Sequence, residues 1–141
     1  MNQTQGVVVS VRILTKARKR LSCNQKIPKF IINTNVSKDK VPYCLIEELT
    51  HQLTKALGKT AQYLVLQIST DQLLSFHGSK DPCTMCFLYS IGNIGDQENK
   101  DYSKLLCDLL NKHPKNTCRQ IYISYFDTSA ATVGWNHTTF A

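Results

Sequence analysis

The apolar residues of this chain follow the order strand, helix, strand, and this order occurs twice. Strands are marked by short apolar and β-branched runs, whereas helices repeat apolar residues at spacings of three and four. The first unit covers residues 28–34, 41–57 and 63–69, and the second covers residues 83–91, 96–112 and 121–126. Parallel strands joined through a helix need a right-handed crossover, so the pattern predicts two β-α-β units.

Two such units predict an α/β (α+β) fold with pseudo-two-fold symmetry, in which one four-stranded mixed sheet carries both helices on one face. Apolar residues also alternate onto the other face, which this layout leaves uncovered. Because a monomer would not expose so large an apolar patch to water, the pattern predicts oligomerisation. The tail over residues 130–141, with Val133-Gly134-Trp135 and Phe140, is apolar enough to dock on a neighbour.

Proline and glycine mark the predicted element boundaries. Pro28 suits the first position of a strand, since it has no N–H to donate to the sheet. Pro42 fits the first turn of the helix over 41–57, and Gly58 fits the position just after that helix ends.

The net charge of +7 is unevenly distributed along the chain. Residues 1–27 contain six Lys/Arg and no acid, whereas residues 28–141 contain eleven Lys/Arg against ten Asp/Glu. The nearly balanced body argues against nucleic acid as a partner. We therefore expect two parts: a basic, disordered N-terminal extension over 1–27 and a folded domain over 28–141. A mitochondrial-type transit segment is the alternative for the extension, since it is rich in Arg and free of acids.

The six cysteines are too scattered for a small disulfide scaffold, so reduced thiols are expected. Zinc binding by Cys83 and Cys86 with His77 or His113 lacks a second ligand pair at suitable spacing, and we expect no metal and no cofactor. No run of about eighteen apolar residues exists, so no membrane span is expected. The apolar stretch 7–14 contains Arg12 and precedes its basic cluster, which makes it a poor secretory signal.

Six short stretches of this chain, spread between the first strand and the C-terminus, resemble one protein family closely. They are Asn33-Thr34-Asn35, Asp71-Gln72-Leu73, Pro82-Cys83-x-x-Cys86, Ser90-Ile91-Gly92, Tyr102-Ser103-Lys104-Leu105-Leu106-Cys107 and Val133-Gly134-Trp135-Asn136. Together they resemble the macrophage migration inhibitory factor family of the tautomerase superfamily, without an evident gap from Pro28 to Ala141. The resemblance implies a homotrimer, keto-enol tautomerase (isomerase) activity on phenylpyruvate-like and dopachrome-like substrates, and signalling as an inflammatory cytokine.

The resemblance also implies partners and a location. The partners would be cell-surface receptors of the family's type, CD74 and chemokine receptors, together with small aromatic keto acids. The protein would be extracellular, exported without a signal peptide, and also cytoplasmic. Lys38 and Asp71 resemble the charged pair through which the family engages a chemokine receptor.

The family's site residues carry over onto matching positions of this sequence. Pro28 stands at the position of the catalytic N-terminal proline, which acts as the base. The substrate-binding positions correspond to Lys59, Ile91, Tyr122, Ser124, Val133, Trp135 and Phe140. Cys83 and Cys86 resemble the family's thiol-redox motif, but they lie on a predicted strand rather than at a helix N-terminus, so buried structural thiols are the preferred interpretation. Lys29, Ser124 and Tyr89 stand where the family usually has methionine, asparagine and histidine.

The chemistry of Pro28 depends on what is attached to its nitrogen. A free α-amine has a reference pKa of about 7.7 to 8.0, and an apolar pocket with the nearby Lys59 ammonium would lower it, giving a neutral base near physiological pH. In this chain, however, Ile27 precedes Pro28, and an acylated proline nitrogen is a tertiary amide that cannot accept a proton. Two hypotheses follow: a cytokine with tautomerase activity once Pro28 is exposed, or a catalytically inactive signalling or binding protein.

Overall fold

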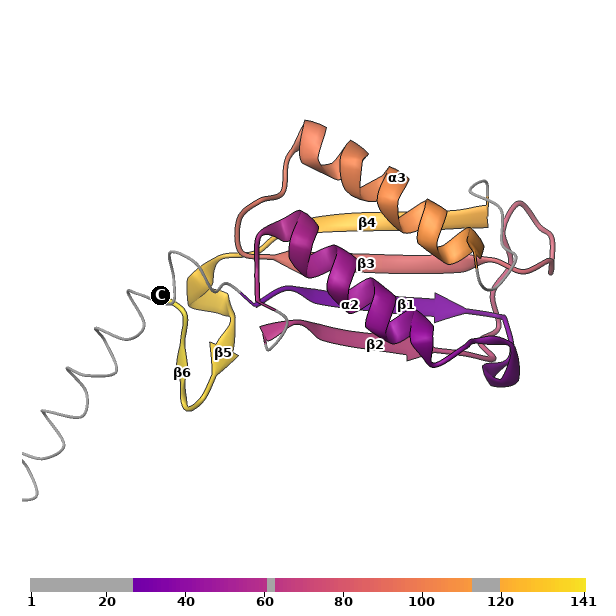
Figure 1. Cartoon of the computed structure of the whole chain (residues 1–141), viewed down its shortest axis with the longest axis horizontal. Helices are drawn as coiled ribbons and strands as arrows, with labels where there is room; N and C mark the ends of the chain where they lie inside the picture. The colour runs from indigo at the N-terminus through magenta and orange to yellow at the C-terminus, as the bar shows by residue number, and fades with distance from the viewer. Residues whose placement is uncertain (1–26, 61–62, 113–119) are drawn as a thin grey trace, which may run out of the picture.

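The computed structural model describes residues 27–60, 63–112 and 120–141 of this chain. The expected extension over 1–27 therefore lies outside the described residues, apart from Ile27. The described residues form one four-stranded sheet with two helices packed on it, and a small C-terminal hairpin extends from one end (Figure 1).

The sheet confirms the predicted fold class. Its strands are β1 (Lys29–Thr34), β2 (Val65–Ser69), β3 (Thr84–Ser90) and β4 (Ile121–Asp127), arranged in the order β2-β1-β3-β4. The outer pairs β1–β2 and β3–β4 are parallel, and the central pair β1–β3 is antiparallel. Each parallel pair is one β-α-β unit, and the two units meet at the central pair with the predicted pseudo-symmetry.

The two long helices also lie where the sequence predicts them. They are α2 (Cys44–Leu57) and α3 (Asp96–Lys112), and a short 3₁₀ turn over Lys38–Lys40 precedes α2. Gly58 follows α2 in the left-handed conformation, with φ of 65°. A residue with a Cβ adopts this conformation only at a cost, which explains the glycine.

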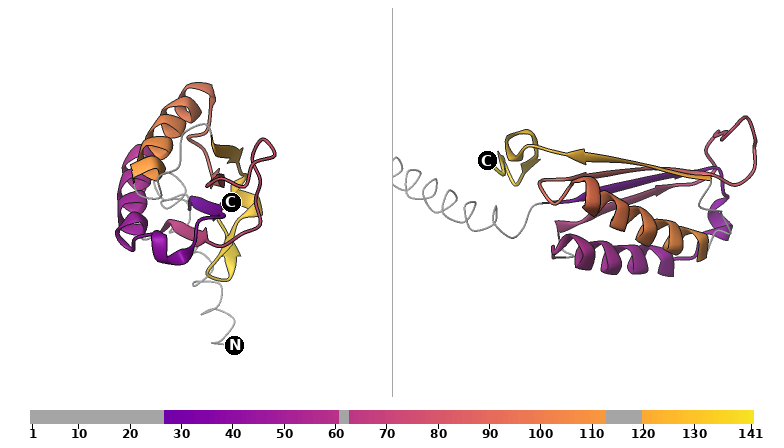
Figure 2. Two further views of the ribbon diagram at one scale, coloured as in Figure 1. Left: turned by 90° about the vertical axis from the view of Figure 1, so that its right-hand side faces the viewer. Right: turned by 90° about the horizontal axis from the view of Figure 1, so that it is seen from above.

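The hydrophobic core fills the space between the helices and one face of the sheet. Figure 2 shows both helices side by side on that face. The strands contribute alternate residues, as a period of two requires. The core cluster comprises Phe30, Ile32, Cys86, Leu88 and Ile121 from the strands, with Leu45, Leu49, Leu53, Leu57, Tyr102, Leu106 and Leu110 from the helices.

The opposite face of the sheet carries apolar side chains that no helix covers. Val65, Tyr122 and Phe126 are 53%, 56% and 39% exposed, and Phe87 between them is half-buried. The sequence prediction of an uncovered apolar face is therefore confirmed in the described chain. An apolar surface of this kind on a sheet marks an interaction site.

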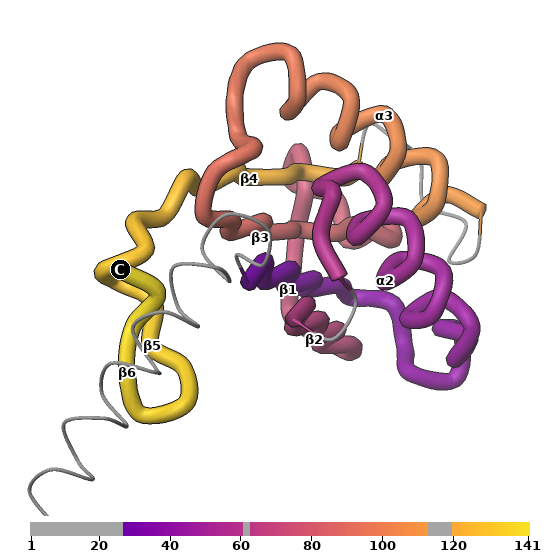
Figure 3. The backbone as a smooth tube through the Cα atoms, turned by 60° about the vertical axis from the view of Figure 1, so that its left-hand side comes forward, coloured from indigo at the N-terminus to yellow at the C-terminus, as the bar shows by residue number. Residues whose placement is uncertain are grey.

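The C-terminal tail forms a hairpin that the sequence did not predict. A 3₁₀ turn over Ala130–Thr132 leads into β5 (Gly134–Trp135), which pairs with β6 (Thr138–Thr139). Asn136 and His137 make the turn between them with φ of 49° and 67°. Figure 3 shows this hairpin beyond the end of β4, beside the start of β1.

Within the described residues, no helix combines the length and apolar character needed to cross a membrane. The same residues hold no cluster of three or more His, Cys, Asp or Glu side chains that could bind a metal ion.

We predict that Leu49→Ala destabilises the fold far more than Ile46→Ala on the same helix. Leu49 is fully buried, whereas Ile46 is 40% exposed. Removing a buried leucine side chain leaves a cavity and costs about 2–5 kcal/mol, whereas surface substitutions usually stay within about 0.5 kcal/mol. Urea denaturation at one fixed protein concentration measures both variants. Equal losses of stability would contradict the packing described above.

Candidate functional site

The candidate site lies at the end of the sheet where β1 begins and where β3 and β4 end. The antiparallel pairing of β1 with β3 sets Lys29 opposite Tyr89, and the parallel pairing of β3 with β4 sets Tyr89 opposite Phe126. The C-terminal hairpin covers the same end (Figures 1 and 3). Segments far apart in the sequence therefore meet around Pro28.

Pro28 is fixed at the head of the first strand. Its side chain is fully buried, and its carbonyl accepts a 3.0 Å hydrogen bond from the Val65 N–H. This bond extends the β1–β2 ladder by one residue. Its nitrogen is bonded to Ile27, so in this chain it is an amide without usable basicity.

A cavity of about 530 Å³ opens beside Pro28. The residues on either side of Pro28, Ile27 and Lys29, both line it. Its apolar wall comes from Val65, Tyr89, Val133 and Trp135, and Thr128 and Thr132 also contribute to the lining. The cavity is of the size that small-molecule sites usually have.

The end of helix α2 positions Lys59 near this end of the sheet. The Gly58 N–H donates to the Lys55 carbonyl and the Lys59 N–H donates to the Thr54 carbonyl, which together form a Schellman motif. The Lys59 side chain is half-buried, and its Nζ lies 3.5 Å from the carbonyl oxygen of Ile91. Ile91 is buried directly after β3. The helix terminus thus brings an ammonium group to the end of the central strand.

Aromatic packing holds Trp135 in place at the cavity. The Tyr63 ring meets the Trp135 ring edge-on at 5.8 Å between centroids, and the Phe140 ring stacks on it at 6.2 Å. Phe140 is itself buried, and its N–H donates to the carbonyls of Ala130 and Val133. Predicted site residues Val133, Trp135 and Phe140 therefore form one unit.

Tyr122 and Ser124 do not join this cluster within one chain. Tyr122 pairs with Met85, four residues before the Tyr89–Phe126 level, so about 13 Å of strand separates it from the cavity level. It lines a separate hollow of about 270 Å³ with Phe76 and Cys83. The structure thus places Tyr122 near the other end of the sheet, and Ser124, which pairs with Phe87, in the middle of β4.

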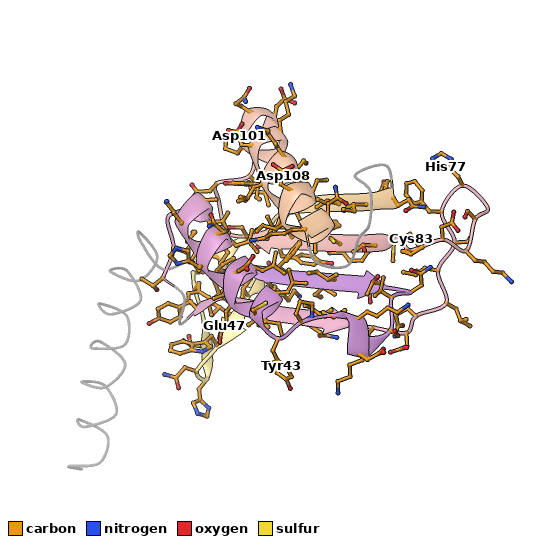
Figure 4. All side chains as sticks on the ribbon, turned by 45° about the vertical axis from the view of Figure 1, so that its right-hand side comes forward. Tyr43, Glu47, His77, Cys83, Asp101 and Asp108 are labelled. Atoms are coloured by element: carbon orange, nitrogen blue, oxygen red, sulfur yellow. The ribbon has the colours of Figure 1, made fainter. Side chains whose placement is uncertain are left out.

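The two cysteines of the Cys83-x-x-Cys86 motif are both buried. Cys83 lies just before β3, at the sheet end near the loop that carries His77 (Figure 4). Cys86 belongs to the core under α2 and α3. Burial raises the pKa of both thiols, and for Cys86 the neighbouring Cys107 raises it further. A raised pKa leaves little thiolate, which is the reactive form.

Lys38 and Asp71, the two predicted receptor contacts, lie together, and the contact between them uses the backbone of Lys38 rather than its charge. The Lys38 N–H donates to the Asp71 carboxylate at 3.2 Å. Both residues line an open hollow of about 950 Å³ with Ile46 and Tyr43. Tyr43 is 87% exposed and points away from the body at the start of α2 (Figure 4).

Several cavity residues were not among the predicted site residues. Val65 lines the cavity because the register of β1 against β2 sets it opposite Lys29. Thr128 lines it because it directly follows β4, and Ile27 lines it because it precedes Pro28. Period-two alternation alone could have placed Lys29 and Tyr89 on the open face. Only the register of β1 against β3 shows that these two residues are neighbours.

This arrangement of fold and site places the chain among the tautomerase-like α+β proteins, and comparison with solved structures agrees. Macrophage migration inhibitory factor from Trichinella spiralis superposes with a TM-score of 0.77 at 35% identity, covering 79% of this chain and 98% of that chain. The homologue from Prochlorococcus marinus gives 0.75 at 26% identity, covering 80% and 99%.

Sequence comparison is more specific. The family model for macrophage migration inhibitory factor (MIF) matches residues 27–141. The factor from Meriones unguiculatus is 52% identical over 115 residues, and that from Xenopus laevis is 51% identical over 115 residues; both alignments cover 82% of this chain and 100% of the relative. The chain belongs to the macrophage migration inhibitory factor family. As a member, it belongs to a family of cytokines in which tautomerase activity occurs.

The burial of the motif cysteines predicts their reactivity. In the folded protein, iodoacetamide should label the exposed Cys44 quickly and Cys86 only after unfolding, because a buried thiol with a raised pKa offers neither access nor thiolate. Peptide mapping by mass spectrometry follows each thiol separately. Labelling of Cys86 in native protein at the rate of Cys44 would show instead that the motif is accessible for redox chemistry.

Proposed function

We propose that this chain is a pro-inflammatory cytokine of the macrophage migration inhibitory factor family, and that it tautomerises phenylpyruvate-like and dopachrome-like compounds when Pro28 is a free N-terminus. One observation carries the catalytic part. Pro28 is buried at the head of β1, and the residues on either side of it line a cavity of about 530 Å³. A secondary amine at this point would face an apolar, partly enclosed space.

The proposed reaction is a proton transfer within the substrate. The neutral amine of Pro28 removes a proton from the carbon next to the keto group, which leaves an enolate. Returning the proton to the enolate oxygen gives the enol and regenerates the amine. The Lys59 ammonium stabilises the enolate oxygen, while Ile91, Val133, Trp135 and Phe140 form the apolar surroundings.

A second function is supported by the bond between Ile27 and Pro28. With that bond intact, no base is present, and the protein is a signalling or binding protein without catalysis. The domain boundary proposed at residues 27 and 28 coincides with this bond, so cleavage there separates the two functions. Lys38 and Asp71, held together by a hydrogen bond, are the proposed receptor contact in both forms.

We further propose that the chain assembles as a homotrimer. The open sheet face supplies the apolar surface, with Val65, Tyr122 and Phe126 exposed on it. Assembly also accounts for the absence of Tyr122 and Ser124 from the cavity lining of one chain, since a neighbouring subunit can bring them to the cavity. The proposed location is extracellular without a signal peptide, and cytoplasmic.

The catalytic proposal is tested with two forms of the protein. The chain beginning at Pro28 should enolise phenylpyruvate at a readily measured rate, whereas the full chain, verified by intact mass, should show at least about a hundredfold less, because general-base catalysis contributes about 10²- to 10⁴-fold. Absorbance of the enol at steady state measures the turnover.

The control keeps the new N-terminus and removes its ring. A chain beginning at residue 28 with Pro28→Gly presents a primary amine in the same place and should retain only a small part of the activity. Equal turnover by the full chain and the Pro28 form would exclude Pro28 as the base. Absence of turnover in the Pro28 form would exclude the tautomerase and support the second function, a signalling or binding protein without catalysis.

The assembly proposal is tested by two substitutions at equally exposed positions. Phe126 on the open sheet face is 39% exposed and Ile46 on helix α2 is 40% exposed. Phe126→Asp should lower the mass measured by light scattering from trimer towards monomer, since it places a charge in an apolar interface. Ile46→Asp should leave the mass unchanged. A monomeric unsubstituted protein would refute the proposed trimer.

A further inference from the structure

Lys29 brings a positively charged side chain to the cavity of the candidate site. Its Nζ lies 4.3 Å from the centre of the Tyr89 ring, which is within the range of a cation–π interaction. The Tyr89 ring in turn stacks on Phe126 at 4.6 Å and 12° between the ring planes. Three residues that face one another across β1, β3 and β4 thus form a continuous column.

Lys29 is exposed, and this column favours one position of its ammonium group over the others. A lysine side chain in water samples many rotamers, and ordering it costs about 1.5–2 kcal/mol. The rings of Tyr89 and Phe126 restrict that freedom before any ligand arrives, so less is lost when an anion binds. An ammonium over an aromatic face also keeps hydrogen-bond donors directed away from the ring.

The cavity around Lys29 has the composition of a site for a small organic anion. Among its lining residues in the described chain, Lys29 is the one charged side chain. Asp127 directly precedes the cavity residue Thr128, but its carboxylate accepts a 2.9 Å hydrogen bond from the Gly92 N–H, in the turn after β3. No carboxylate forms a salt bridge with Lys29 within the described residues.

The remaining walls determine which anion fits. Trp135, Val133 and Val65 offer apolar surface, and Tyr89 also lines the cavity. An apolar wall of this kind with one fixed cation suits an aromatic ring that carries a carboxylate. Binding of a ligand by these groups does not depend on a basic nitrogen at Pro28.

We propose that Lys29, held on Tyr89, forms a carboxylate-binding subsite in this cavity, so that the full chain with Pro28 acylated binds small aromatic carboxylates without converting them. In the form that begins at Pro28, the same subsite selects substrates that carry a carboxylate. The inference shares its cavity with the proposed tautomerase, but binding to the full chain does not depend on catalysis.

The single tryptophan of the chain provides the measurement. Trp135 lines the cavity, so its fluorescence reports on ligands there without interference from another tryptophan. The full chain is titrated with 3-phenylpropanoate, which has an aromatic ring and a carboxylate but no keto group, and with 3-phenylpropanamide, its neutral counterpart. The carboxylate should bind at least about tenfold more tightly, since charge-assisted contacts to a fixed cation exceed neutral ones by about that factor.

Three substitutions separate the charge of Lys29 from its bulk. Lys29→Met keeps the chain length but removes the charge, and it should abolish the preference for the carboxylate. Lys29→Arg keeps the charge and the contact with Tyr89, and it should retain the preference. Lys55→Met removes an exposed lysine from helix α2 and should change nothing. A preference that survives Lys29→Met, or no binding of the carboxylate by the full chain, would overturn the inference.

A separate assay distinguishes failure of this inference from failure of the proposed function. In the form that begins at Pro28, Lys29→Met should raise KM for phenylpyruvate by about tenfold and leave kcat within about twofold, because it removes binding common to substrate and transition state. Unchanged KM with normal turnover would overturn the subsite alone. Binding by the full chain without turnover in the shorter form would overturn the tautomerase alone.

Discussion

The packing of α2 and α3 against one face of the sheet decides which strand side chains are buried and which lie on the open face. Because strand side chains alternate, burying Phe30 and Ile32 beneath the helices turns Lys29 and Ile31 to the opposite face. A slip of one residue in register would exchange the two sets and place a lysine in the core. The buried face therefore fixes the chemistry of the open one.

The directions of the strands then determine which residues of the open face lie at the same end of the sheet. The antiparallel centre of the sheet brings the start of β1 beside the ends of β3 and β4, and the hairpin closes over the same end. Pro28 and Trp135 meet there although most of the domain separates them in sequence. Tyr122 begins the same strand that Phe126 nearly ends, so one strand serves both ends of the sheet. A single chain cannot unite these positions, whereas a neighbouring subunit can.

The sequence was sufficient for the four sheet strands, the two long helices and the fold class, because their signals are local or periodic. Pro28, Gly58 and the helical spacing of leucines each act within a few residues, and the observed boundaries agree with them. The column of Lys29, Tyr89 and Phe126 could not be foreseen from the pattern alone, because it depends on register between three strands. The hairpin over Gly134–Thr139 escaped prediction because its strands are two residues each. Short strands carry no measurable alternation.

The bond between Ile27 and Pro28 separates the two properties that we propose for one cavity. Proton abstraction requires a lone pair on the proline nitrogen, and amide resonance removes it. Electrostatic binding of an anion requires only a fixed positive charge, and Lys29 provides it whether the bond is intact or cut. The two proposed properties therefore respond differently to proteolysis: cleavage would add catalysis to a site that, on our proposal, binds anions before it is cut. In a chain that keeps residues 1–27, the proposed role of the cavity is therefore to bind anions. The apolar walls around Trp135 contribute to binding both before and after cleavage.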